Sequence, residues 1–333
     1  MPEGFTAALL AVFGLAVLFD YINGFHDTAN AIATSVSTRA LSPRLAIAMS
    51  ATANFAGALT GTAVAKTIGA GLIAPQAEGG LVVAAALVGA IVWNLLTWRL
   101  GIPSSSSHAL IGGLLGASAA AVGFGAWQVD GILGKVILPL IGSPIVGFVG
   151  GFALMVVIFN LFRRAHPKTM NDRFRRLQVL SAAFMAFSHG SNDAQKTMGV
   201  MTLALLSAGI IPEFKVPLWV IILAASAISL GTAAGGWRII RTMGSKVVKL
   251  DPVHGFAAET TAATIIFGAS TLGMPVSTTH VISSAILGVG SSDRFRAVHW
   301  GVARRIGIAW VLTLPASGLV AALAYVLLRP MLG

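Results

Sequence analysis

Long apolar segments recur along the chain and limit its fold more than any other feature of the sequence. The longest runs are Phe5–Phe19, Gly80–Leu96, Val136–Phe162, Val216–Leu230 and Gly301–Leu328. Segments of about 20 apolar residues are long enough to cross the roughly 30 Å hydrocarbon core of a bilayer as helices. Because backbone polar groups inside a bilayer need partners within the protein, we expect these segments to be helical. The sequence therefore predicts an all-α integral membrane protein.

Charged residues are scarce, and most of the basic ones lie between the apolar runs. Of the 333 residues, 56% are hydrophobic and 10% are charged, whereas a soluble domain carries about 25% charged residues. The formal net charge of +11 fits loops that face an anionic membrane surface better than a nucleic-acid interface. The segment Arg163–Arg176 holds six Lys or Arg residues and one acid, which predicts a cytoplasmic location. We therefore expect membrane lipid, and no nucleic acid, around this protein.

Two motifs occur twice, once on each side of the basic segment. Residues 24–27 (GFHD) match residues 190–193 (GSND) at an offset of 166 positions. Residues 101–108 (GIPSSSSH) match residues 273–280 (GMPVSTTH) at an offset of 172 positions. Two motifs that recur in the same order and at nearly the same spacing indicate an internal repeat. Paired repeats with Gly and Pro interruptions are typical of transporters, whose site lies between the repeats near the middle of the membrane.

The repeat divides the chain into three parts. We expect a first transmembrane repeat at residues 1–162, a basic cytoplasmic linker at residues 163–176 and a second transmembrane repeat at residues 177–333. Together they are expected to form about 10–12 helical segments. Helices expected near residues 27–38 and 277–290 are too short to span a bilayer. They predict broken or re-entrant helices, with the repeated motifs at the breaks.

Hydroxyl side chains follow the Gly-x-Pro of each repeat, although the surrounding sequence is apolar. The candidate substrate-binding residues are Ser104, Ser105, Ser106, Ser107, Ser277, Thr278 and Thr279. Proline interrupts the preceding helix and Ser or Thr favours an N-cap, so a new helix should begin in each run. Hydroxyls and free N–H groups at the positive end of a helix form an uncharged anion site. Two facing helix starts could thus surround a tetrahedral oxyanion; the alternative is capping and hydroxyl-mediated helix packing.

Carboxylates at membrane depth normally mark function, because insertion of each costs about 2.5–3.5 kcal/mol. The candidate cation-binding residues are Asp27, Asn30 and Asp193, with Asn23 and Asn192 as helpers. Carboxylate, amide and backbone carbonyl oxygens suit Na⁺ or a hydrated divalent ion. The alternative is that each aspartate is the N-cap of a helix that starts there.

Three further residues are candidates for coupling or proton transfer. His26 precedes Asp27, Lys196 follows the second acidic motif, and Glu259 lies inside an apolar segment. Histidine changes charge near neutral pH, and a buried lysine could neutralise a carboxylate or attract an anion. The sequence has no cysteine and no nucleotide-binding P-loop, and it offers no convincing catalytic set. We therefore expect no enzymatic activity, no catalytic residue, no cofactor and no metal beyond a coupling cation, with an ion gradient as the energy source.

The duplicated motifs resemble those of the inorganic phosphate transporter (PiT) family over essentially the whole chain. The relevant stretches are NGFHDTANAIAT at residues 23–34 and SHGSNDAQKTMG at residues 188–199, each followed by G-x-P-x-S-[ST]-[ST]-H. The resemblance implies a multi-span symporter with two inverted repeats, and association as a homodimer. It also implies that phosphate lies between the two hydroxyl runs and that the Asp and Asn motifs hold the cations.

Two departures from the family pattern bear on the coupling ion. Sodium-coupled relatives typically read G-A-N-D-x-A-N in both repeats, whereas this chain has His26 in the first and Gln195-Lys196 in the second. The pattern is more similar to the bacterial low-affinity branch, which implies H⁺ rather than Na⁺ and carriage of metal–phosphate complexes. We expect a plasma-membrane phosphate symporter that works by alternating access. A sulfate permease of the same fold and a passive anion channel remain open as alternatives.

Overall fold

The computed structural model describes residues 6–70, 72–74 and 79–332. Within these residues the chain folds into helices, and the only β pairing is an isolated bridge between Ile73 and Trp127. The predicted all-α class is confirmed.

Helices of similar kind follow one another in the same order in the two halves of the chain. The first half forms α1 (Ala7–Ser37), α2 (Pro43–Ala58), α3 (Ala63–Ala70), α4 (Gly80–Leu100), α5 (Ser106–Val122), η2 (Phe124–Ala126), α6 (Val129–Ile132), η3 (Leu133–Ile137) and α7 (Leu138–Leu161). The second half forms α8 (Pro167–Ser207), α9 (Leu218–Ala234), α10 (Trp237–Arg241), η4 (Thr242–Lys246), α11 (Pro252–Thr271), α12 (Thr278–Asp293), η5 (Phe295–Ala297) and α13 (Trp300–Leu332). In each half a long first helix is followed by a medium and a short one, then by a helical hairpin and a long last helix.

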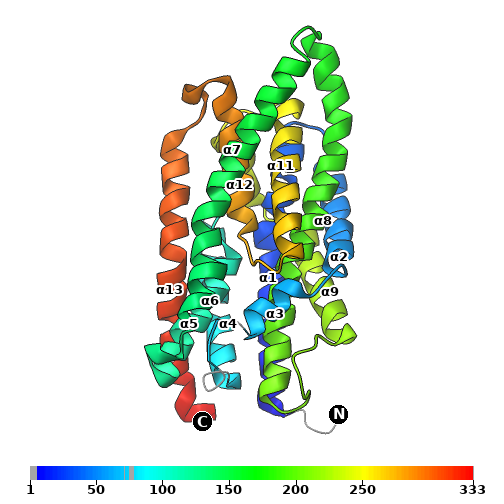
Figure 1. Cartoon of the computed structure of the whole chain (residues 1–333). Helices are drawn as coiled ribbons and strands as arrows, with labels where there is room; N and C mark the ends of the chain where they lie inside the picture. The colour runs from blue at the N-terminus through cyan, green and yellow to red at the C-terminus, as the bar shows by residue number, and fades with distance from the viewer. Residues whose placement is uncertain (1–5, 71, 75–78, 333) are drawn as a thin grey trace.

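Helices of one half pack on helices of the other, and each such contact has a counterpart between the equivalent helices. Helix α1 packs on α9, and α2 packs on α8; likewise α5 packs on α13, and α7 packs on α12. In Figure 1 the hairpin of α4 and α5 occupies the lower part of the molecule, and the hairpin of α11 and α12 occupies the upper part. These matched contacts between the two halves are consistent with a duplicated unit. The inverted relation between the repeats stays a prediction.

Four helices are long and apolar enough to cross a membrane, judged by length and composition over the described residues. They are Ala7–Ser37, Gly80–Leu100, Val129–Leu161 and Trp300–Pro330, and the pair Leu218–Ala234 and Trp237–Lys246, bent by 60°, could form a fifth span. Most of every predicted apolar run lies on one of these helices, and Phe5 is outside the described residues. Helices α7 and α13 also expose many large apolar side chains, as contact with lipid requires.

The basic segment predicted as a linker is partly helical. Residues 163–166 connect α7 to α8, and α8 begins at Pro167, a residue type that favours the first position of a helix. Residues 167–176 therefore form the first turns of α8. In Figure 1 this connection lies at the opposite end of the molecule from the start of α1 and the end of α13. Its exposure to the cytoplasm stays a prediction.

The acidic motifs lie inside unbroken helices, so the prediction of helix breaks at these motifs was wrong. Helix α1 continues through Asp27, and α8 continues through Asp193. Neither aspartate can be an N-cap, since each lies several turns from the start of its helix. The expected short helix at residues 27–38 is accordingly the last part of α1.

The motif glycines allow close helix packing instead of breaking the helices. A Cβ on Gly24 would collide with the backbone of α9 at Ile228, and a Cβ on Gly190 would collide with the backbone of α2 at Asn54. A glycine in a helix costs about 1 kcal/mol relative to alanine. Here the close approach of the neighbouring helix offsets that cost, an effect that the local sequence does not reveal.

The motifs lie where two apolar clusters of the interior meet. One cluster includes the residues of α1 up to Ile22 and those of α8 from Ala194 onward. The other includes the residues of α1 from Ala29 onward and those of α8 up to Ala186. The polar residues between these limits are therefore held between two packed cores, halfway along the long helices.

Candidate functional site

Each hydroxyl run lies at the start of a helix, as predicted. Helices α4 and α11 end beside a glycine with positive φ, 66° at Gly101 and 68° at Gly273. Ser105 and Ser277 are the N-caps of α5 and α12, and each hydroxyl accepts the backbone N–H three residues on at 3.2 Å. The capping role is thus taken by one serine in each run. The remaining hydroxyls are engaged elsewhere.

The hairpin turns are anchored on the opposite halves of the chain. The hydroxyl of Thr242, in η4, donates to the carbonyl oxygen of Gly101 at 2.8 Å. The hydroxyl of Thr67, in α3, donates to the carbonyl oxygen of Gly273 at 2.8 Å. A movement of one half relative to the other must therefore act on both hairpin turns.

The two helix starts meet in the interior of the molecule. The hydroxyl of Ser107 donates to the carbonyl oxygen of Val276 at 3.4 Å. The buried rings of His108 and His280 lie 4.8 Å apart between centroids, and His280 stacks on Trp310 at 4.0 Å. Donor groups from both halves are thereby gathered around one buried region.

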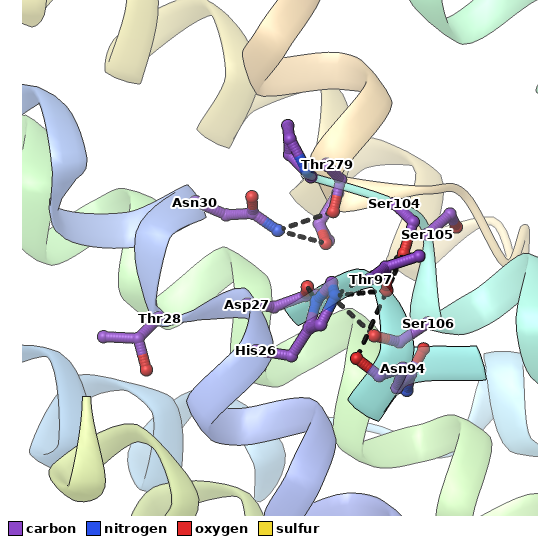
Figure 2. A network of polar contacts seen from close by, with 12 residues as sticks. His26, Asp27, Thr28, Asn30, Asn94, Thr97, Ser104, Ser105, Ser106 and Thr279 are labelled. Atoms are coloured by element: carbon purple, nitrogen blue, oxygen red, sulfur yellow. Dashed lines mark hydrogen bonds and ion pairs between the residues drawn. The ribbon is translucent and has the colours of Figure 1, made fainter. Parts of the chain in front are cut away.

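Asp27 lies at the centre of a polar network that joins α1 to the first hairpin (Figure 2). One of its carboxylate oxygens lies 2.5 Å from Nδ1 of His26, and the other accepts the hydroxyl of Ser106 at 3.4 Å. Nε2 of His26 lies 3.1 Å from the hydroxyl of Thr97, to which Ser104 donates at 2.8 Å. Thr97, which no motif marked, therefore connects the histidine to the hydroxyl run.

Asn30 connects α1 to the second hairpin instead. Its amide donates to the hydroxyls of Thr279 at 2.9 Å and of Thr278 at 3.3 Å, as Figure 2 shows for Thr279. The amide nitrogen thus faces the hydroxyl run of the other repeat. One predicted cation ligand is in this way bound directly to two predicted substrate ligands.

Asp193 occupies the equivalent place on α8. One of its oxygens accepts the hydroxyl of Thr278 at 3.0 Å and lies 3.0 Å from Nε2 of His189. The other oxygen is paired with the ammonium group of Lys196. All three side chains around Asp193 are buried.

Lys196 reaches from α8 to both hairpins. Besides Asp193, its ammonium group donates to the hydroxyl of Ser107 and to the carbonyl oxygen of Val276, the latter at 3.1 Å. Its side chain is only 1% exposed. The three N–H donors of the ammonium group therefore have three protein oxygens as partners.

The fold brings the two predicted carboxylate ligands together and adds a histidine that was missed. Ligand atoms of Asp27, Asp193 and His189 all lie within 4.8 Å of one another, a spacing that could hold a metal ion. His189 was assigned no ligand role from the sequence. The signal was nonetheless present, since His189 precedes Asp193 by four residues, and residues four apart share a face of a helix.

The two predicted helper amides have different surroundings. Asn192 donates to the carbonyl oxygen of Met274 at 3.3 Å, so its amide nitrogen holds the second hairpin turn. Asn23 is buried, and its side-chain oxygen has no hydrogen-bond partner among the described residues. The side-chain oxygen of Asn192 likewise has no partner among the described residues, so both amide oxygens are free to coordinate an ion.

Glu259 lies in a separate buried polar cluster. Its carboxylate accepts the hydroxyls of Thr34 and Ser181, each at 2.5 Å, and the amide of Gln178 at 3.1 Å. Thr34 is on α1, two turns beyond Asp27, and the other two donors are on the first part of α8. The structure therefore does not bring Glu259 into direct contact with Asp27 or with the hydroxyl runs.

Comparison with known proteins identifies the group to which this geometry belongs. The family model described as "Phosphate transporter family" matches residues 23–321. The chain is 52% identical to a probable low-affinity inorganic phosphate transporter of Bacillus subtilis, over 94% of this chain and 95% of the relative. It is 50% identical to a protein of the same description from Rhizobium meliloti, over 95% of each chain. A solved structure, "The sodium-dependent phosphate transporter", matches with a TM-score of 0.90 and 26% identity, covering 98% of this chain and 100% of the other.

Proposed function

This chain belongs to the phosphate transporter family, and we propose that it is a secondary active symporter that imports inorganic phosphate across the plasma membrane. Family membership and the apolar helices make it a multi-pass membrane transporter rather than an enzyme. Three features belong to the proposal: coupling to a cation gradient, H⁺ in preference to Na⁺, and alternating access.

One observation carries the proposal: each hydroxyl run is hydrogen-bonded to a carboxylate of the acidic motif in the same repeat. Ser106 donates to Asp27, and Thr278 donates to Asp193. A hydroxyl that donates to a carboxylate has no proton left for an anion. A cation at Asp27 would satisfy its charge and release Ser106 to donate to phosphate. Cation binding would in this way favour phosphate binding, and the reverse, as symport requires.

The same carboxylates favour phosphate over sulfate. Phosphate near neutral pH keeps at least one proton, so it can donate a hydrogen bond to Asp27 or Asp193, whereas sulfate has none to give. A nearby carboxylate therefore rejects sulfate by leaving charges unpaired. The phosphate ligands we propose are Ser104, Ser105, Ser106, Ser107, Ser277, Thr278 and Thr279. A metal–phosphate complex would fit the same place with its metal toward the carboxylates.

The preference for H⁺ rests on what surrounds the two aspartates. The solved relative is described as sodium-dependent, and carboxylate and hydroxyl oxygens would suit that ion. In this chain, however, the ammonium group of Lys196 already contacts Asp193, and His26 contacts Asp27. Glu259, whose hydrogen-bond donors are all neutral, is the further candidate for carrying a proton.

Uptake of labelled phosphate by the purified protein in liposomes tests the proposal. The same preparation is assayed with a pH gradient, with a sodium gradient and with neither, each with and without excess sulfate. The proposal predicts accumulation above equilibrium that needs the pH gradient and is insensitive to sulfate. Purely downhill flux would favour a passive channel, and strong competition by sulfate would favour a sulfate permease.

A further inference from the structure

The acidic motifs of the two repeats build equivalent sites that differ by one fixed charge. At the offset of 166 positions that relates Asp27 to Asp193, Asn30 corresponds to Lys196. Both side chains cross to the hydroxyl run of the opposite repeat: Asn30 donates to Thr279, and Lys196 donates to Ser107. The first site thus ends in a neutral amide and the second in an ammonium group.

The partners of the ammonium group are the kinds of oxygen that bind a small alkali cation. They are a carboxylate oxygen of Asp193, the hydroxyl of Ser107 and the carbonyl oxygen of Val276. Carboxylate and carbonyl oxygens are preferred ligands of hard cations, and exposed backbone carbonyls coordinate Na⁺ in transporters. These oxygens come from three separate segments: α8, the first turn of α5 and the hairpin turn before α12. The ammonium group therefore joins three segments that a bound cation could otherwise join.

We propose that the ammonium group of Lys196 is a built-in cation that permanently occupies the second of two equivalent cation sites, so that only the Asp27 site takes a mobile cation. The proposal rests on the symport function proposed above and extends it to the specificity of each site. A simple ion pair along one helix would explain the contact with Asp193 alone. It would not explain the contacts with Ser107 and Val276, which lie on different segments.

The first site lacks such a built-in charge. Among the described residues, the ion-pair partner of Asp27 is His26, which carries charge only when protonated. Asn30, in the position of the lysine, is directed at hydroxyls and brings no charge. A cation that enters from solution therefore has an unneutralised carboxylate to bind at Asp27, and ligand atoms of Asp193 and His189 within 4.8 Å could complete its coordination. The place beside Asp193 that the ammonium group of Lys196 fills is already taken.

The experiment replaces Lys196 of the second site by asparagine, the residue at the corresponding position of the first site. Lys196→Asn removes the ammonium group and should leave an oxygen-lined site that Na⁺ can fill. In purified protein, NaCl at about ten times the dissociation constant should raise the Tm of this variant by about 2–4 °C over N-methylglucamine chloride at equal concentration. Wild-type protein and the matched control Lys215→Asn, which changes an exposed lysine in a loop, have at most one open cation site and should show a smaller rise. Lys196→Gln serves as a second variant if the asparagine variant does not fold.

The outcomes separate this proposal from the transport function. A gain of Na⁺-dependent stability in either Lys196 variant supports the proposal, whether or not phosphate is transported. Folded variants that are indifferent to Na⁺, or wild-type protein that Na⁺ stabilises equally, would overturn it. Binding of ²²Na⁺ to the wild type needs no variant: at most one ion per chain is expected, and two would overturn the proposal. A failure of phosphate uptake in liposomes would instead count against the symport function.

Discussion

The two acidic motifs share one framework and differ in their chemistry. In both, an aspartate in the middle of a long helix accepts a hydroxyl from its own repeat, Ser106 for Asp27 and Thr278 for Asp193. Asp27, however, has an adjacent histidine, whereas Asp193 has a histidine four residues earlier and a lysine as well. The geometry is therefore similar at the two aspartates, while the charges around them differ. We therefore expect the two aspartates to have different roles in transport.

Asp193→Asn should have the largest effect, because it leaves a buried ammonium group without its counter-charge. Breaking a buried ion pair from one side typically costs about 3–5 kcal/mol of stability. We expect a large loss of thermal stability and of uptake, measured by thermal unfolding in detergent and by liposome assay. The double variant Asp193→Asn with Lys196→Met should recover most of the stability. A single variant as stable as wild type would mean that the two sites do not differ in charge.

Asp27→Asn should strongly reduce coupled uptake with a much smaller change in stability, since Asp27 has no fixed cationic partner that would be left unpaired. We expect uptake to fall by about 10–100-fold, the usual range for loss of a group that supports an ion site. Initial rates in liposomes, compared with the Tm of the same preparation, check the expectation. Wild-type rates in this variant would remove Asp27 from the coupling site.

Glycine-to-alanine changes at the two motifs should have similar effects, because the packing is equivalent in the two halves. Gly24→Ala and Gly190→Ala each force a methyl group against the backbone of a neighbouring helix. Overpacking of this kind typically costs about 1–3 kcal/mol. Thermal unfolding of the two variants should show comparable losses, with Gly14→Ala as a control that has open space around the new methyl group. Unequal losses would show that the framework itself has diverged.

The smallest effects are expected from single hydroxyls of the substrate site. Ser106→Ala and Thr278→Val each remove a hydroxyl that donates to a carboxylate without phosphate and to phosphate when it binds. The binding free energy should therefore change by the difference between two charged hydrogen bonds, about 1 kcal/mol. The KM for phosphate should therefore rise by about fivefold in each variant, with little change in Tm. Saturation curves of initial uptake provide the measurement. An unchanged KM in both variants would limit these hydroxyls to helix packing.

The sequence predicted the features that local chemistry controls. Gly-x-Pro followed by hydroxyl residues ends one helix and caps the next within a few positions, so the helix starts at Ser106 and Thr278 were predictable. The apolar runs likewise identified the long outer helices. Both signals depend on neighbours in the chain and not on tertiary packing.

The predictions failed where a distant helix decides the outcome. Gly24 and Gly190 suggested breaks, but they serve the close approach of α9 and α2, which sequence alone does not place there. The sequence also indicated no partner for Glu259; in the fold its partners are Thr34, Ser181 and Gln178, in a cluster separate from the acidic motifs, and its role in coupling stays a prediction. No motif links those four residues, because they come from three helices that meet only in the folded chain.

The central claim is that phosphate transport is coupled to a cation that binds at Asp27, where no built-in charge is present. Comparison of the wild type with the variant Asn30→Lys tests this claim. Phosphate accumulation by the two proteins is measured side by side in sodium-free liposomes under one imposed pH gradient. We expect the wild type to accumulate phosphate above equilibrium. A lysine in the first site should supply a built-in cation there too, so the variant should bind phosphate but only equilibrate it. A wild type that only equilibrated phosphate, or a variant that accumulated it as the wild type does, would contradict this mechanism.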